Sequence, residues 1–396
     1  MTRRKGAAPP EFDQPGLFPS REQHLVLSAA LGQGSAARLA YEQWLATVDL
    51  ERDFDREVFR LLPLLYDNLR RLGHQDALTG RLKGTYRLAW AGNHRLFEET
   101  RPVLDRFLAA GLRVMVLKGA PLALSYYGNP AVRPMADVDF AVPSGQVEAA
   151  AAILADLGYV PWLDLDADAR RFRHAVGFRA PGRKELDLHW HILLDFCDDG
   201  ADEVFWQTAQ PFRFLDHEIL APDATRMLLL TIIHGLRWNE EPPVRWIPDA
   251  VMILRSAHAQ LDWDWIVAFA TGRSITYRLR LGLAYLAETF SAEVPPVVLS
   301  RLSDVRPTWR ERLELRTLMK PVRYESAVGP LLYALSEFPR LPDTGTPLRA
   351  VGAFTHFLRF HWGLSGRREI PGRLLQGIRR RSGRAVAGAA RVRDRR

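Results

Sequence analysis

The chain has 396 residues, of which 47% are hydrophobic, so it can bury a sizeable core without disulfides or metal staples. Its single cysteine, Cys197, excludes an internal disulfide and any cysteine-based zinc or iron–sulfur cluster, which agrees with a reducing compartment. The net charge of +8 comes from residues 367–396, which carry a net charge of +9, so the rest of the chain is close to neutral.

Composition shifts divide the chain into five parts. Residues 1–20 are polar and rich in proline, which indicates a disordered arm without the apolar middle of a signal peptide. Apolar spacing then predicts a helical region over 21–110, a mixed region over 111–220, a second helical region over 221–365 and a basic tail over 366–396. No apolar run approaches the ~20 residues that span a bilayer, so we expect a cytoplasmic protein.

The first informative element follows helices predicted over 54–72 and 82–108. Residues 112–117 form an apolar strand that breaks at Lys118 and Gly119, before a helical segment over 120–127. A strand, a glycine and a helix in this order are typical of a phosphate-binding turn, because glycine admits close approach and the helix start offers free N–H groups.

The next predicted strand, over 137–142, carries Asp137 and Asp139. Side chains alternate along a strand, so these two carboxylates point to the same face, about 7 Å apart along the chain. Hard cations such as Mg²⁺ bind one or two carboxylates and complete their shell with substrate phosphates. The pair therefore predicts a site for divalent metal ions and a nucleoside triphosphate (NTP).

A third carboxylate comes from a strictly alternating strand over 184–191. Glu185, Asp187 and His189 share one of its faces, so that either acidic residue could complete the metal site. Strands are also predicted over 174–179, which carries His174, and as a pair near 211–220. The remaining predicted helices cover 144–157, 223–238, 246–258, 262–271, 275–290 and 309–319.

Together these motifs carry a resemblance. Leu-Lys-Gly at 117–119, Arg133 four residues before Asp-Val-Asp, and Glu-Leu-Asp-Leu-His-Trp at 185–190 resemble the uncharacterised nucleotidyltransferase family of the DNA polymerase β-like superfamily. The weaker motifs at 229–235 and 245–250 fit too, and the resemblance covers roughly residues 85 to 290. It implies an α+β fold in which a small mixed nucleotidyltransferase sheet is embedded between N- and C-terminal helical regions.

The resemblance also implies roles for single residues. Asp137, Asp139 and Asp187 would be the catalytic metal ligands, with Asp187 favoured over Glu185, and Gly119 would hold the triphosphate. Ala120 departs from the family, which usually places serine or glycine there, so Lys118 and Arg133 are expected to contact the phosphates instead. His189 would orient a carboxylate or contact phosphate.

The predicted function is a nucleotidyltransferase that uses Mg²⁺ or Mn²⁺ to move a nucleoside monophosphate from an NTP such as ATP to an unidentified acceptor hydroxyl. A toxin-like enzyme that modifies tRNA or protein, and a non-catalytic nucleotide-binding module, remain alternatives. The basic tail would contact a polyanion such as RNA or acidic lipid without taking part in transfer. The sequence leaves the nucleotide, the acceptor and the oligomeric state open.

Overall fold

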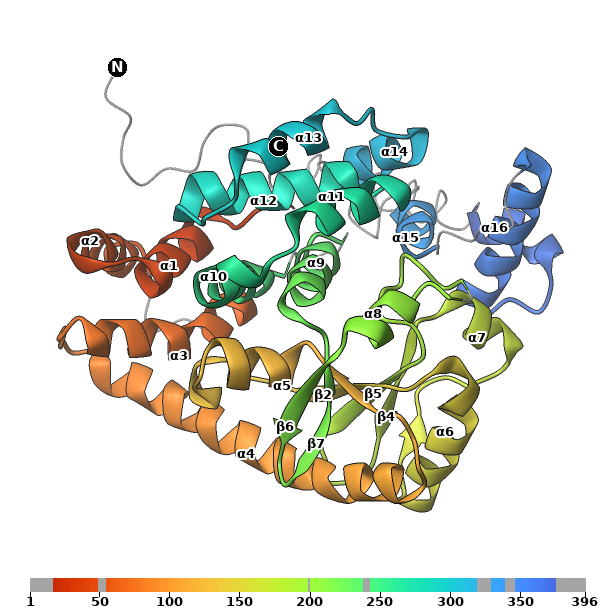
Figure 1. The fold of residues 1–396 in the computed structure, drawn as a ribbon, viewed down its shortest axis with the longest axis horizontal. Helices are drawn as coiled ribbons and strands as arrows, with labels where there is room; N and C mark the ends of the chain where they lie inside the picture. Colours follow the sequence, from red (N-terminus) through yellow and green to blue (C-terminus); the bar gives the residue numbers. More distant parts are fainter. Residues whose placement is uncertain are drawn as a thin grey trace, which may run out of the picture.

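A computed structural model describes residues 17–48, 55–198, 200–237, 243–318, 329–338 and 346–374. A single seven-stranded sheet lies at its centre, and helices from both ends of the chain surround it (Figure 1). The expected α+β architecture, with a small mixed sheet embedded between helical regions, is therefore confirmed.

The N-terminal helices form one end of the molecule. A capping box starts the first of them, because the Ser20 hydroxyl accepts from the Gln23 backbone while the Gln23 side chain accepts from the Ser20 backbone. Leu17 and Phe18, within the arm expected to be disordered, are buried in the core, and residues 1–16 lie outside the described residues. The helices are α1 (Arg21–Leu31), α2 (Gly34–Leu45), α3 (Arg56–Arg71) and α4 (Thr79–Ala109).

The sheet is mixed, with the strand order β3-β4-β5-β2-β1-β7-β6. The pairs β2–β5 and β1–β7 are parallel and all others are antiparallel. The sequence predicted every strand except β3, whose two residues are too short for a periodic signal. The strands are β1 (Met115–Leu117), β2 (Asp137–Ala141), β3 (Val160–Pro161), β4 (Ala175–Arg179), β5 (Glu185–His189), β6 (Gln210–Phe214) and β7 (His217–Ala221).

The two faces of this sheet differ in character. On one face the alternate residues Val138, Phe140 and Leu188 are buried in a cluster with Phe107 of the long helix α4 and with Leu154 of α6 (Val147–Asp156). On the other face the same strands present carboxylates and His189. The alternation predicted from the sequence thus separates a packing face from a polar face.

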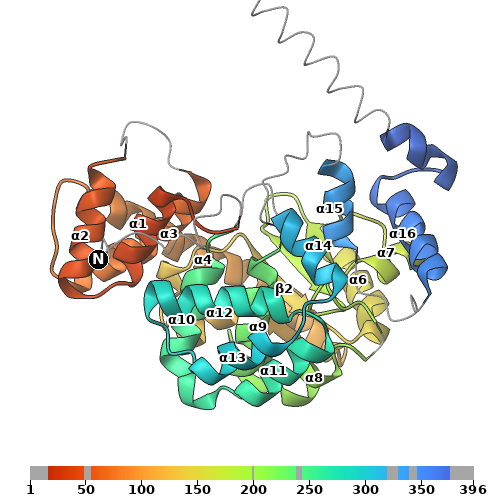
Figure 2. The same ribbon diagram turned by 90° about the horizontal axis from the view of Figure 1, so that it is seen from above.

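The remaining helices begin with the short α5 (Gly119–Pro121), which continues into a π-helical turn over Leu122–Tyr126, and α9 is buried almost all round. The helices after α6 are α7 (Ala167–Phe172), α8 (Glu203–Thr208), α9 (Ala224–Gly235), α10 (Trp246–Ala257), α11 (Trp263–Gly272), α12 (Thr276–Phe290), α13 (Pro296–Asp304), α14 (Trp309–Leu318), α15 (Gly329–Glu337) and α16 (Pro347–His361). In both views α16 lies at the opposite end of the molecule from α1–α3 (Figure 2).

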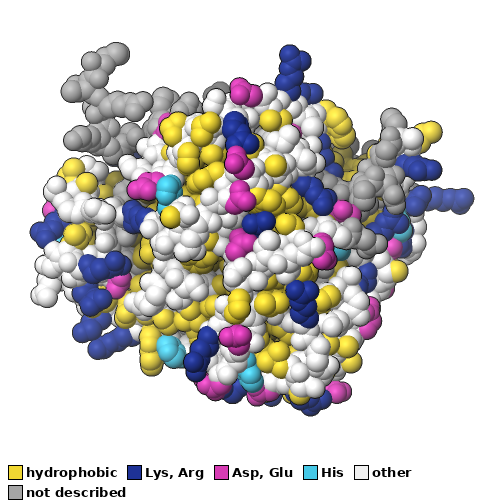
Figure 3. All heavy atoms as spheres, viewed as in Figure 1, with side chains coloured by type: hydrophobic (Ala, Val, Ile, Leu, Met, Phe, Trp, Pro, Cys, Tyr) yellow, Lys and Arg dark blue, Asp and Glu magenta, His cyan; other side chains and the backbone are white. Residues whose placement is uncertain are grey.

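The C-terminal part was predicted least well. α13, α15 and α16 were not anticipated. The last two pack with Phe338 and Phe357 on Phe172 of α7 in a separate small core. Ile370, within the expected tail, is buried in the same cluster, whereas residues 375–396 lie outside the described residues. No helix in the described ranges is long and apolar enough to cross a membrane. On the face seen in Figure 1, acidic and basic side chains are interspersed among hydrophobic ones (Figure 3).

Candidate active site

The polar face of the sheet assembles the site by register. Asp139 of β2 lies beside Asp187 of the parallel strand β5, and Leu117 of β1 lies beside Asp139 on its other side. Asp137 lies one pair further along the same face, beside the exposed Glu185. The strand pairing therefore places Asp139 and Asp187 directly side by side on neighbouring strands.

Asp139 is the centre of the arrangement and is only 6% exposed. Lys118 Nζ donates to its Oδ1 at 2.7 Å, and His189 Nε2 lies 3.0 Å from the same oxygen. Burial alone would raise the pKa of the Asp139 carboxyl, but Lys118 and His189 outweigh it and hold that pKa well below its usual range. Asp139 is therefore a carboxylate at neutral pH.

Asp137 and Asp187 show the opposite behaviour. Burial, followed by the charges of Asp139 and Asp187, raises the pKa of Asp137 to about 6. Burial and the Asp139 charge likewise raise the pKa of Asp187. Close carboxylates with disfavoured charge are the arrangement that a divalent cation relieves.

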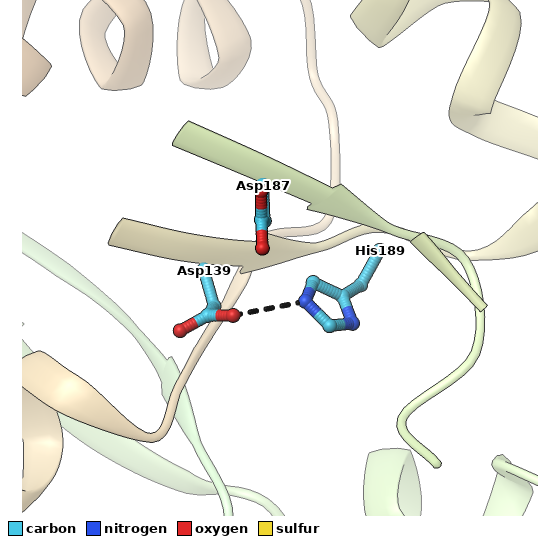
Figure 4. A group of neighbouring side chains, drawn as sticks. All are labelled: Asp139, Asp187 and His189. Carbon is cyan, nitrogen blue, oxygen red and sulfur yellow. Dashed lines mark hydrogen bonds and ion pairs between the residues drawn. The ribbon is translucent and has the colours of Figure 1, made fainter. Parts of the chain in front are cut away.

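The donor set fits such a cation. Ligand atoms of Asp139, Asp187 and His189 all lie within 4.8 Å of one another, and the three side chains point to the same side of the strands (Figure 4). His189 Nδ1 lies 3.3 Å from the His191 carbonyl, which can only accept a hydrogen bond. In the metal-free protein Nε2–H donates to the Asp139 carboxylate, and a metal ion would replace that proton while Nδ1–H keeps its carbonyl partner, as in other metal-binding histidines.

Sequence reasoning placed His189 beside a carboxylate or phosphate and did not foresee it as a ligand. Asp137, which was predicted as a metal ligand together with Asp139 and Asp187, shares the face and lies two register positions away from that pair, and its role as a ligand stays a prediction. Because imidazole is a better ligand for transition-metal ions than for Mg²⁺, a histidine in this donor set bears on the choice of metal. The alternation of β5 was the available signal, since it put His189 and Asp187 on one face.

The Lys118–Gly119 turn joins β1 to α5 in a strained conformation. Lys118 has φ 49° and ψ −102°, a backbone conformation that residues other than glycine rarely adopt. In this conformation its ammonium group donates to Asp139. A Cβ on Gly119 would lie 2.9 Å from Met135 Sδ and 3.3 Å from Arg133 Nη1. A side chain at 119 would therefore have to displace Met135 or Arg133, and the predicted close approach of a phosphate to the Gly119 backbone stays a prediction.

Arg133, predicted as a phosphate clamp, has a protein partner. Its Nε and Nη2 donate to the two carboxylate oxygens of Asp249 on α10, each at 2.8 Å, and Tyr127 Oη donates to the same carboxylate at 2.8 Å. This bidentate pair fixes the segment before β2 to the second helical region. Only Arg133 Nη1, beside Gly119, faces the turn, so its contact with phosphate stays a prediction.

A second set of cationic and imidazole groups lies around Lys118. The His174 ring meets the His189 ring edge to face at 5.1 Å, and burial lowers the pKa of both His174 and His234 well below the usual value. The charge of Arg237, which follows α9, also lowers the pKa of both histidines. Arg237 Nη2 donates to Glu337 of α15 at 2.6 Å. Sequence reasoning missed Arg237, for which no motif gave a signal.

Taken together, this fold and site define a nucleotidyltransferase. The model of the family described as "Uncharacterised nucleotidyltransferase" matches residues 57–291, more than half of the chain, and the protein belongs to that family. It is accordingly an enzyme of the transferase class, as the sequence motifs indicated. Among curated proteins, none matches the chain.

Solved structures provide distant similarities. The lincosamide antibiotic adenylyltransferase LnuA, bound to lincomycin, is 14% identical with a TM-score of 0.30 over 39% of this chain and 94% of its own. The antibiotic-resistance factor ANT(2'')-Ia is 15% identical, TM-score 0.32, over 41% and 85%. An antigenic nucleotidyltransferase-like protein from Paracoccidioides brasiliensis is 13% identical, TM-score 0.32, over 55% and 96%.

Proposed function

We propose that the protein transfers a nucleoside monophosphate from an NTP to an acceptor hydroxyl in a reaction that depends on Mg²⁺ or Mn²⁺. The observation that carries the proposal is the placement of Asp139 and Asp187 side by side on parallel strands, with His189 within ligand distance and the Lys118 turn adjoining. Asp139, Asp187 and His189 would hold the metal, with Asp137 as a further carboxylate on the same face. When bound, the ion neutralises phosphate charge and favours ionisation of the acceptor hydroxyl.

The residues of the chain have separate tasks in this reaction. The acceptor oxygen attacks the α-phosphorus, the bond to the bridging oxygen breaks, and its electron pair leaves with pyrophosphate. Asp187 accepts the proton of the acceptor hydroxyl, because it is the carboxylate on the side of Asp139 away from the Lys118–Gly119 turn. Lys118 and the Gly119 backbone hold the triphosphate, and Lys118 exchanges its Asp139 partner for phosphate oxygens.

The direct test uses the full chain with labelled NTPs, Mg²⁺ or Mn²⁺ and a cell extract as the source of acceptors. Pyrophosphate release and a labelled product are expected from the wild type, and Asp139→Asn and Asp187→Asn should each lower the rate by roughly 10²–10⁴-fold. Glu185→Gln is the matched control, because this exposed carboxylate lies on the same strand. Greater damage from Glu185→Gln than from Asp187→Asn would reverse the choice of the third carboxylate.

The same assay separates the alternatives. Binding of an NTP without pyrophosphate release, with every acceptor fraction tried, would identify a nucleotide-binding module instead of an enzyme. A labelled product that is RNA or protein would identify a macromolecular acceptor. We also propose that the arginine-rich segment 367–396 contacts a polyanion, so deletion of 375–396 should weaken salt-sensitive retention on heparin and leave transfer to small acceptors unchanged.

A further inference from the structure

Trp162 lies at the end of the row of residues that forms the active site. It follows the edge strand β3, and its backbone N–H donates to the Gly177 carbonyl at 2.9 Å. Gly177 pairs with Asp187, which pairs with Asp139. These pairings form a row across one face of the sheet, in the order Trp162, Gly177, Asp187 and Asp139. Trp162 is therefore two strands from Asp187, with only a glycine between them.

Because residue 177 is glycine, no side chain separates the Trp162 indole from the Asp187 carboxylate. A Cβ built on Gly177 would lie 3.7 and 3.8 Å from Cδ2 and Cε2 of Trp162, and 3.0 Å from Oδ1 of Asp187. The ring thus rests against the bare backbone of β4, alongside the Asp187 carboxylate. Trp162 nevertheless remains 62% exposed, so that much of its surface is free to meet a ligand.

The order of residues in this row indicates whether Trp162 would contact the NTP or the acceptor. The Lys118–Gly119 turn is at one end, next to Asp139, and Trp162 is at the other, next to Asp187. In an in-line displacement the acceptor oxygen enters opposite the leaving pyrophosphate. If the triphosphate is held at the turn, the acceptor enters on the side of Asp187 and therefore of Trp162.

The charges around this end favour an acceptor without phosphates. Asp187, Asp137 and the exposed Glu185 share the face, exposed Asp164 follows two residues after Trp162, and these carboxylates outnumber the exposed Arg179 on the same face of β4. A phosphate-rich strand would be repelled by these carboxylates, whereas hydroxyl groups donate hydrogen bonds to them. A ring that carries hydroxyls and has an apolar face satisfies both the carboxylates and the indole.

We propose that Trp162 is a stacking platform for a sugar ring of the acceptor, which it holds with one hydroxyl directed toward Asp187. The axial C–H bonds of a pyranose are weakly positive and suit the negative face of an indole. This inference rests on the proposed function, since it takes Asp187 as the carboxylate that receives the acceptor proton. It adds the class of the acceptor, a carbohydrate or a glycosylated small molecule.

Binding can be tested without any chemistry, by saturation-transfer NMR on the full chain with a mixture of methyl pyranosides at millimolar concentration, with Mg²⁺ and a non-hydrolysable ATP analogue present. Signal transfer to pyranoside ring protons is expected in the wild type, in Trp162→Phe at reduced strength, and at least fivefold weaker in Trp162→Ala. Trp90→Ala is the matched control, because Trp90 is 51% exposed and belongs to α4, not to the strands that carry Asp139, Asp187 and Gly177. Affinity for the ATP analogue should stay within about twofold of the wild type in all variants.

Three results would overturn the inference: no transfer to any pyranoside in the wild type, equal transfer in Trp162→Ala, or loss of ATP-analogue affinity in that variant. Loss of binding to a single-stranded RNA oligonucleotide in Trp162→Ala would assign the platform to a nucleobase. Since the assay needs no turnover, sugar binding without pyrophosphate release would refute only the proposed function. Once the acceptor is known, an unchanged KM for it in Trp162→Ala would refute only the sugar platform.

Discussion

Asp137 and Asp139 are two residues apart on one strand face, yet replacing each by asparagine should change stability in opposite directions. In metal-free protein at pH 7.5 we expect Asp139→Asn to lower the free energy of unfolding and Asp137→Asn to raise it. The reason is that the fold stabilises the charge of Asp139 through Lys118 and His189, whereas burial and neighbouring carboxylates oppose the charge of Asp137.

The magnitudes follow from these environments. The pKa of Asp137 is raised from 3.8 to about 6, and each unit corresponds to about 1.4 kcal/mol, so removing the charge should stabilise the fold by up to about 3 kcal/mol. Because the folded-state pKa is the higher one, this cost grows as pH rises from 3.8 to about 6 and is constant above it. Asp139→Asn leaves Lys118 without its carboxylate at a site where its side chain is 18% exposed, a loss of about 1–3 kcal/mol.

The assay is urea denaturation of both variants and the wild type in EDTA, at pH 7.5 and pH 5. The gain from Asp137→Asn should shrink markedly at pH 5, where most Asp137 is already protonated, while the loss from Asp139→Asn should persist. Glu185→Gln, an exposed carboxylate beside Asp137, should change stability little and serves as the control. Shifts of the same sign in the two aspartate variants would refute the electrostatic description of the site.

Two further predictions concern the surroundings of the carboxylates, and a third concerns the packing of α16. Lys118→Met should weaken triphosphate affinity by about tenfold or more, measured by calorimetry. An unchanged affinity in this variant would show that Lys118 pairs with Asp139 and does not bind the triphosphate. His189→Phe should weaken Mn²⁺ binding more than Mg²⁺ binding in a paramagnetic relaxation titration, and equal losses would exclude His189 as a ligand. Burial and Arg173 lower the pKa of His361 to about 4, so the packing of α16 should lose at most about 3 kcal/mol as pH falls from 6.5 to 4. Protection factors of the α16 amides, which correct for the pH dependence of intrinsic exchange, should therefore be lower at pH 5 than at pH 7, and this difference should disappear in His361→Phe.

Local patterns in the sequence determined much of the fold and part of the site. Alternation along 137–142 and 184–191 predicted two strands and put Asp137, Asp139, Asp187 and His189 on polar faces, because side-chain direction in a strand depends only on position. The break at Lys118–Gly119 was visible because a glycine ended an apolar run. Helix spacing predicted α3, α4 and most of the second helical region for the same local reason.

Tertiary structure alone decided which of these groups meet. Pairing between β2 and β5 placed Asp139 beside Asp187, which is 48 positions later in the sequence. Packing of α10 against the core placed Asp249 where it accepts hydrogen bonds from Arg133. The two-residue strand β3, too short to show a period, carried Trp162 to the edge of the site. Such contacts depend on register and packing between distant segments, and no short window of sequence contains both partners.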